Sequence, residues 1–168
     1  SGYIPISAVI VNDDLFEPIK EAIGDIGVFG HGYTYTGHPV SCAVALKTLE
    51  IYERDKVFQH ANKVGKYFQN SLKDILKKDY VGEVRGIGLI AGIELYKDPS
   101  NKIPFEEAGK AGKIVSDICQ KNGLIVRPIL DTIALCPPLI ISEKEVDELT
   151  DKLKKSLQEA KDEIMKVH

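Results

Sequence analysis

The sequence predicts an α/β protein in which a short antiparallel sheet is covered by helices. Apolar residues recur at three- and four-residue spacing in several segments, which is typical of helices with one buried face. Short β-branched runs bounded by glycine and proline lie between them and are typical of strands. The length of 168 residues, with 43% hydrophobic and 28% charged residues, suits one domain, or one small domain with an appendage.

The first 54 residues predict one strand and two helices. Residues 8–11 (AVIV) form a continuous apolar run, as expected of a strand buried in a parallel sheet. Residues 12–14 (NDD) can cap a helix over 15–23 that stops at Gly24 and Gly27. Pro39 suits the first position of a helix that runs to about residue 52.

Three further helices are predicted downstream. Asp55 is expected to cap a helix that extends to about residue 75 with one apolar face. Another helix is expected to end at the C-cap signal of residues 122–123. The last helix begins behind a capping box formed by Ser142 and Glu145 and carries an apolar stripe up to residue 164.

The strands are predicted in two pairs. Residues 83–85 and 88–96 are expected to form strands interrupted at Gly86, and 124–127 and 132–135 a hairpin that turns at Asp131. The glycines of the first pair follow a G-x-G-x-x-x-G spacing, which differs from the dinucleotide-binding fingerprint, and strand residues follow where that motif needs a helix. These glycines therefore predict a bulge or a close strand contact.

Composition excludes several classes of protein. A net charge of −3 without a basic block argues against nucleic-acid binding. No apolar run approaches the roughly 20 residues that span a membrane, and no signal-peptide pattern opens the sequence. The three cysteines are an odd number without metal-type spacing, which argues against a disulfide framework and favours a reduced, cytoplasmic location.

The run of residues 30–39 (GHGYTYTGHP) is the most informative segment. Glycines let a backbone approach a ligand, threonines add hydroxyl groups, and the helix that follows offers unpaired N–H groups to an anion. This combination predicts a loop that contacts phosphate. The alternative is a glycine-rich turn whose threonines and histidines only cap the helix.

Four segments in register resemble the class III aminotransferases, which are pyridoxal-phosphate enzymes of fold type I. They are residues 1–9 (SGYIPISAV), 30–39, 84–95 (VRGIGLIAGIEL), and 123–127 (GLIVR) followed by LCPPL. The resemblance is nearest to the omega-amino-acid:pyruvate branch. It implies that residues 1–54 are the end of the large, cofactor-binding domain and that residues 55–168 are the small C-terminal domain.

The resemblance also implies which residues form the site. Thr34 matches a threonine whose hydroxyl reaches the cofactor phosphate of the neighbouring subunit, and Tyr33 matches a residue that donates its backbone N–H. Thr36 matches a variable position and is left out. Arg127, a lone cation behind an apolar run, matches the arginine that binds the substrate carboxylate and swings away when the other substrate lacks one. The alternative is an edge-strand arginine paired with Asp131 or a helix acid.

Other polar residues are not expected to be catalytic. His31 and His38 have no third ligand at metal spacing, and His38 is expected to contact the start of the helix. Cys42 is expected to pack on the buried side of that helix. No catalytic residue and no metal ligand are therefore assigned within the chain.

In the resembling family the catalytic lysine precedes the equivalent of Ser1. We therefore expect a C-terminal fragment that is inactive alone. The implied parent enzyme is a homodimer that moves an amino group from an amine or omega-amino acid to a keto acid such as pyruvate, with pyridoxal 5'-phosphate as cofactor. The alternatives are an aminomutase or decarboxylase of the same family, or a small-domain module that acts only by association.

Overall fold

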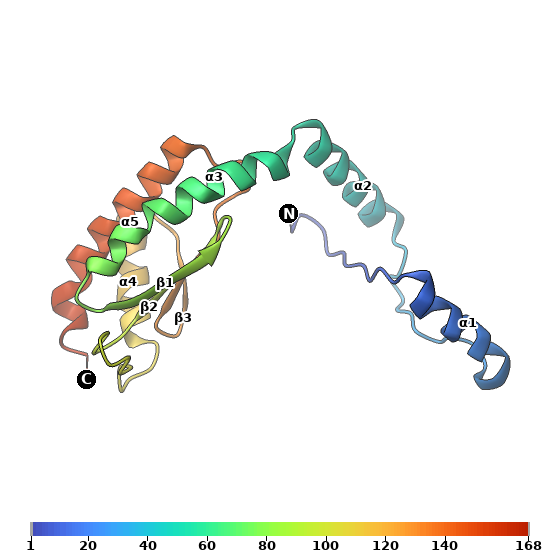
Figure 1. Ribbon diagram of the computed structural model, residues 1–168, viewed down its shortest axis with the longest axis horizontal. Coiled ribbons are helices and arrows are strands. Elements are labelled where there is room, and N and C mark those ends of the chain that lie inside the picture. The colour runs from blue at the N-terminus through green and yellow to red at the C-terminus, as the bar shows by residue number, and fades with distance from the viewer. Residues whose placement is uncertain (1, 168) are drawn as a thin grey trace. The chain divides into compact units, whose positions relative to one another are not determined.

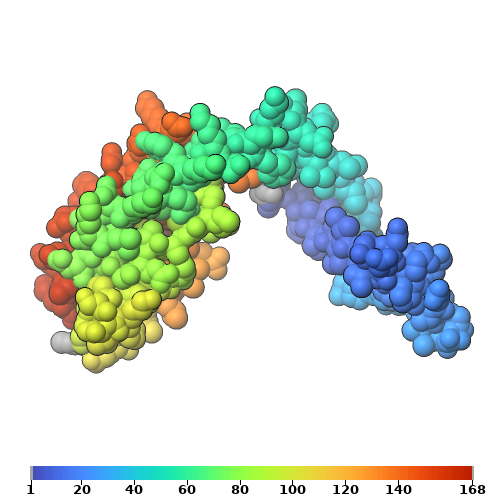
Figure 2. Space-filling view, in the orientation of Figure 1, coloured from blue at the N-terminus to red at the C-terminus, as the bar shows by residue number. Residues whose placement is uncertain are grey.

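A computed structural model describes residues 2–167 and divides into two compact units (Figures 1 and 2). The first unit ends at Asp55 and the second begins at Lys56. Among the described residues, no helix is both long enough and apolar enough to cross a membrane, and no three side chains of the metal-ligating types gather into a metal site.

The second unit is built on a four-stranded antiparallel sheet in the order β1-β2-β4-β3. The strands are β1 (Val81–Ile87), β2 (Ile90–Leu95), β3 (Arg127–Ile129) and β4 (Thr132–Leu135). Alternate residues of β2 and β4, such as Ile93 and Ile133, are completely buried, so one face of the sheet belongs to the core.

Helices α3 (Val57–Ser71), α4 (Lys110–Lys121) and α5 (Glu143–Ile164) contribute the other side of this core. Helices α3 and α5 run side by side in Figure 1. The hydroxyl of Tyr67 on α3 donates to Asp147 Oδ1 on α5 at 2.6 Å, which links these two helices directly. A short 3-10 helix, η1 (Lys73–Lys77), follows α3.

The local signals for α4 and α5 are confirmed. Ser142 and Glu145 form the capping box in both directions, since each side chain bonds the backbone of the other residue. The apolar stripe behind it is buried from Val146 to Ile164, with Leu149 partly buried. Helix α4 ends at Asn122, and Gly123 takes the left-handed conformation that such an end favours.

The first unit contains α1 (Asp13–Ile26) and α2 (Pro39–Arg54). Of the three residues predicted to cap α1, Asn12 is the N-cap, since its side chain accepts from the Leu15 amide at 3.1 Å, and Asp13 and Asp14 lie in the first turn. The apolar side chains of this unit are largely exposed, and among its described residues only Ser41 is buried. The described part of the unit is coloured blue to teal in Figure 2.

The strand predicted at residues 8–11 is wrong for this structure. The segment has no ladder partner, and Val9 and Ile10 are 92% and 94% exposed. A buried strand needs neighbours on both sides to satisfy its amides and carbonyls, and none of the residues of this unit that the structure describes supplies one.

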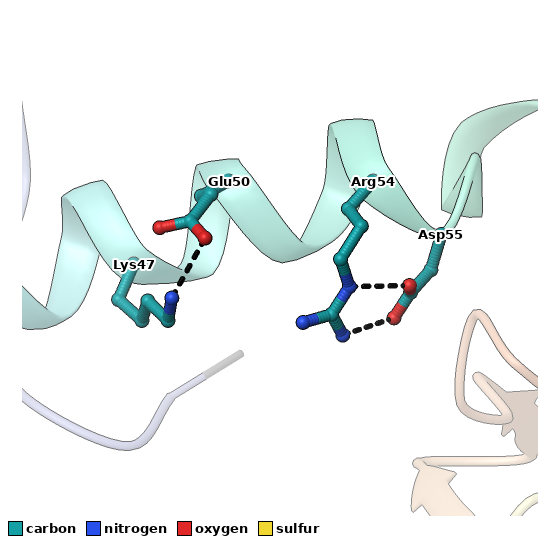
Figure 3. A network of polar contacts seen from close by, with 4 residues as sticks. All are labelled: Lys47, Glu50, Arg54 and Asp55. Carbon is teal, nitrogen blue, oxygen red and sulfur yellow. Dashed lines mark hydrogen bonds and ion pairs between the residues drawn. The ribbon is translucent and has the colours of Figure 1, made fainter.

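The role predicted for Asp55 is also wrong. It closes α2, and its carboxylate accepts two hydrogen bonds from Arg54, from Nε at 2.7 Å and from Nη2 at 2.8 Å (Figure 3). A second pair on α2, Lys47 with Glu50, lies at 2.7 Å. Helix α3 starts behind Lys56, without a side-chain cap. Asp55 therefore lies one residue before the N-cap position of α3, where a side chain is not placed to cap the helix.

The strand boundaries differ in two places. Strand β1 continues through Gly86, and the turn falls at residues 88–89 instead, where Gly88 has a φ of 55°. Strand β3 begins at Arg127, where the sequence had predicted its end. The close contact predicted for the glycines is confirmed at Gly86, since a Cβ there would lie 2.2 Å from the Ile90 carbonyl oxygen.

Candidate functional site

The loop before α2 is held by its own backbone and hydroxyl groups. The Thr36 amide donates to the Tyr33 carbonyl at 2.9 Å, and the His38 amide donates to the Tyr35 carbonyl at 3.2 Å. Gly37 lies between these turns with a φ of 71°, a conformation that glycine adopts without strain. The two consecutive turns direct the chain into α2 and leave the loop side chains exposed.

His38 and the first turn of α2 form the local cap that the sequence predicted. The Ser41 amide donates to His38 Nδ1 at 3.3 Å, and Pro39 occupies the first helical position. Cys42, by contrast, is exposed, so its predicted burial is wrong. It faces a cavity where the first unit leaves its apolar surface uncovered.

This cavity has a volume of about 1030 Å³ and lies wholly within the first unit. Residues 5–9 line one side of it, and the loop with the first turn of α2 lines the other. The polar groups that it presents include Ser7, Thr36, His38 and Ser41. Hydroxyl and imidazole groups beside a helix N-terminus form a donor set suited to an anion.

The two residues predicted to contact phosphate differ in availability. The Thr34 hydroxyl is exposed, makes no hydrogen bond within residues 2–167, and lies outside the lining of the cavity. The Tyr33 amide already donates to Thr36 Oγ1 at 2.9 Å. Sequence reasoning therefore missed Thr36, whose hydroxyl holds the amide that the resemblance assigns to the phosphate. The available signal was a threonine three residues after Tyr33, since a hydroxyl at that spacing can accept from a backbone amide in a turn.

Arg127 begins the edge strand β3 and is exposed. Its cross-strand partner is Ala134, which pairs with Gly92, which in turn pairs with Arg85 on β1. Partners in a ladder share a face, so these four residues form one row across the face of the sheet opposite the core. We call this face, which also carries Glu83 and Glu94, the polar face.

The charged side chains of the polar face differ in whether they have ion-pair partners. Arg85 Nη1 lies 2.6 Å from Glu94 Oε1, and a second glutamate, Glu83, lies 3.9 Å away. The hydroxyl of Tyr96 donates to Glu94 Oε2 at 2.7 Å. Tyr96 and Arg85 together lower the pKa of the Glu94 carboxyl, and the same carboxylate raises the pKa of the Arg85 guanidinium. This cluster is internally compensated.

Arg127, in contrast, makes no ion pair or hydrogen bond through its side chain among residues 2–167. Pairing with Asp131, the alternative stated above, does not occur. The Asp131 carboxylate instead accepts from the amides of Gly109 and Gly112, at 2.9 and 3.0 Å. An exposed guanidinium without a partner remains available to a carboxylate from outside the chain.

Comparison with known proteins identifies the family to which this chain belongs. Residues 1–157 match the family model described as Aminotransferase class-III. The chain belongs to the class III aminotransferases. This membership confirms the predicted family and the α/β fold class with its short antiparallel sheet. Class III aminotransferases depend on pyridoxal phosphate, as the sequence resemblance implied.

Curated relatives in plants are similar over most of this chain. Gamma aminobutyrate transaminase 3, chloroplastic, of Solanum lycopersicum is 39% identical over 164 residues, which are 98% of this chain and 32% of the relative. Gamma-aminobutyrate transaminase 1, mitochondrial, of Oryza sativa subsp. indica is 40% identical over 89% of this chain and 29% of the relative. The chain thus spans about a third of the length of these relatives.

Solved structures agree. The omega transaminase from Pseudomonas jessenii in complex with PMP is 36% identical, with a TM-score of 0.85 over 92% of this chain and 34% of its own. A transaminase obtained by ancestral reconstruction is 38% identical and reaches a TM-score of 0.91 over 97% of this chain and 36% of its own.

The donor groups of the loop are chemically suited to the oxygens of a phosphate. Thr34 offers an unengaged hydroxyl, and its neighbours present backbone in the turns that precede a helix N-terminus. The loop itself carries no cation, because residues 30–39 contain neither lysine nor arginine. A phosphate here would be held by hydroxyl and amide groups on this side, with the balancing charge supplied from elsewhere.

Proposed function

We propose that this chain supplies the C-terminal part of an aminotransferase. In this proposal the full-length protein transfers an amino group from an amine or omega-amino acid to a keto acid such as pyruvate. The family membership supports amino transfer, and the names of the plant relatives support omega-amino acids of the γ-aminobutyrate type as donors. The observation that carries the proposal is the unpartnered guanidinium of Arg127.

Arg127 binds the carboxylate of the acceptor in this proposal. Keto acids and omega-amino acids both carry a carboxylate, and an arginine can hold one through two parallel hydrogen bonds. The residue lies on an edge strand with no ion-pair partner among the described residues to compete for its charge. Its position on an exposed edge also leaves room for the guanidinium to withdraw when a substrate lacks a carboxylate.

Thr34 and Tyr33 contact the cofactor phosphate in this proposal. The exposed Thr34 hydroxyl donates directly, whereas the Tyr33 amide must first release Thr36 Oγ1. Bound pyridoxal phosphate supplies the carbonyl group that receives the amino group and the electron sink that stabilises the substrate carbanion. In this proposal the residues of this chain contribute binding and orientation.

We further propose that the full-length protein acts as a homodimer, with Thr34 reaching the phosphate of the neighbouring subunit. Its position outside the cavity of its own unit supports this arrangement. We also propose a cytoplasmic location, since Cys42, Cys119 and Cys136 are free cysteines and disulfides are rare in that compartment. Light scattering and cell fractionation test these two proposals.

The deciding experiment supplies the full-length protein and pyridoxal phosphate with pyruvate and γ-aminobutyrate. Formation of alanine supports the proposal. Formation of a decarboxylated or rearranged amine with pyruvate unchanged contradicts it and favours the decarboxylase or aminomutase alternative. Residues 1–168 alone, mixed with pyridoxal phosphate, are expected to develop no absorbance band of covalently bound cofactor, and such a band would contradict the proposed inactivity of this chain.

A further inference from the structure

We propose that Asp131 is a positioning residue for Arg127, which rests on the carboxylate-binding role proposed above. The two residues belong to one hairpin, in which Ile129 pairs with Thr132 across a two-residue connection. Asp131 lies in that connection, and Arg127 begins the strand that leads into it. In this proposal the Asp131 carboxylate, at the turn of the hairpin, sets the position of the Arg127 guanidinium at the start of strand β3.

The Asp131 carboxylate attaches the hairpin to helix α4. Its Oδ2 accepts from the Gly109 amide at 2.9 Å, and its Oδ1 accepts from the Gly112 amide at 3.0 Å. These amides belong to the N-terminus of α4, whose own N-cap residue is a glycine without a side chain. A carboxylate satisfies such unpaired amides and is favoured by the positive end of the helix dipole. Asp131 thus caps a helix that begins about twenty residues earlier in the chain.

The backbone is shaped for the same contact. A Cβ added at Gly112 would lie 2.0 Å from the Leu130 carbonyl oxygen, so only glycine allows the hairpin to approach this closely. Leu130 has a φ of 51°, which is costly for a residue with a side chain. The two hydrogen bonds of Asp131 hold the connection in this conformation against the helix.

Strand β3 has few hydrogen-bond partners within the sheet. Strand β3 has three residues and pairs with β4 on one side only. Its middle residue is Pro128, which has no amide hydrogen. Loss of the two hydrogen bonds to Asp131 would leave the pairing of β3 with β4 intact but let this hairpin tilt relative to α4. Bidentate binding of a carboxylate depends on the direction of the guanidinium plane, so a tilt weakens it without touching the substrate.

A double-mutant cycle in the full-length protein tests the inference. Asp131→Asn keeps one acceptor and the shape of the side chain. We expect it to raise the KM of the keto-acid half-reaction about tenfold, the effect of one charge-assisted hydrogen bond. The half-reaction with an amine that lacks a carboxylate is expected to stay within about twofold. In the Arg127→Ala background, Asp131→Asn is expected to change neither half-reaction further.

The matched control is Asp117→Asn, which removes a carboxylate of α4 that pairs with Lys113 on the exposed side of the helix. It is expected to leave both half-reactions unchanged. Gly112→Ala is a second variant, because it keeps Asp131 but forces the hairpin away from α4. It is expected to reproduce the selective rise in KM. Thermal unfolding of each variant establishes that the measured protein is folded.

The outcomes separate this inference from the proposed function. If Arg127→Ala changes both half-reactions equally, the carboxylate-binding role fails, whatever Asp131 does. If Arg127→Ala is selective but Asp131→Asn has the same effect with and without Arg127, the positioning role is overturned and Asp131 acts only on the fold. Equal effects of Asp131→Asn on both half-reactions also overturn it.

Discussion

Arg85 and Arg127 occupy the two edges of one cross-strand row, separated by Gly92 and Ala134. Three strand spacings of about 4.8 Å place their backbones roughly 14 Å apart on the same face. Arg85 is neutralised by Glu94 at 2.6 Å, whereas Arg127 has no such partner among the described residues. Two exposed arginines of one row therefore differ in whether their charge is compensated, which makes Arg85 a suitable control for Arg127.

Arg127→Ala is expected to raise KM for keto-acid acceptors in the full-length protein by tenfold or more, because a charge-assisted bidentate contact contributes at least about 1.5 kcal/mol. The KM for simple amines that lack a carboxylate is expected to change far less. Steady-state kinetics with both substrate classes measures the difference. Arg85→Ala serves as the control and is expected to leave both KM values unchanged. Equal effects on the two classes would assign Arg127 a structural role.

Thr34→Ala is expected to weaken retention of pyridoxal phosphate, because it removes an exposed hydroxyl with no other partner in residues 2–167. Dialysis of the loaded protein against buffer, followed by cofactor absorbance, measures retention. The control is Thr48→Ala, whose hydroxyl donates to the Val44 carbonyl inside α2 at 2.8 Å. Identical loss from both variants and the unmodified protein would contradict the phosphate contact.

Gly65→Ala is expected to lower the free energy of unfolding by about 1–3 kcal/mol, the usual cost of overpacking. A Cβ at this position on α3 would lie 2.8 Å from the backbone of Gly88, and backbone has little freedom to withdraw. Gly92→Ala is the control, since its Cβ would meet Thr132 at an ordinary 3.4 Å. Urea unfolding compares the two. Equal stability of both variants would show that the contact between α3 and the β1–β2 turn is loose.

The lowered pKa of the Glu94 carboxyl leads to a prediction of how the free energy of unfolding depends on pH. Hydrogen bonds from Tyr96 and Arg85 lower its pKa in the folded state below the unfolded value of about 4.3. Its contribution is therefore complete above pH 4.3 and is lost as pH falls through the folded pKa. Glu94→Gln is expected to make the free energy of unfolding fall less steeply as pH decreases through that acidic range. The exposed Glu163→Gln is the control, and the same slope in both variants would contradict the assignment.

Much of the fold was predictable because it depends on residues close together in the chain. The capping box of Ser142 and Glu145 and the end of α4 at Asn122 use contacts within about one helical turn, and the stripe of α5 follows from the regular spacing of its apolar residues. Asp55 shows the limit of this reasoning. A capping residue type was present, but the chain turns one residue later, so Asp55 closes α2 and its carboxylate pairs with Arg54.

The candidate site was predictable in part. Residues Tyr33, Thr34 and Arg127 were identified by their resemblance to a family, and their roles stay predictions. The partnership of Tyr33 with Thr36 and the exposure of Cys42 were missed. A strand at residues 8–11 was predicted from an apolar run, but hydrogen-bond partners outside the run decide whether a strand exists.

The sequence by itself determined the family, the alternation that buries one face of the sheet, and the local caps of α1, α2 and α5. Only the tertiary structure decided which charges remain available. Asp131 is drawn to the amides of α4 and Glu94 to Arg85, so Arg127 keeps an unpaired charge among the described residues. The physical reason is that a carboxylate binds whichever donors the fold brings within about 3 Å, and those donors lie far away in the chain.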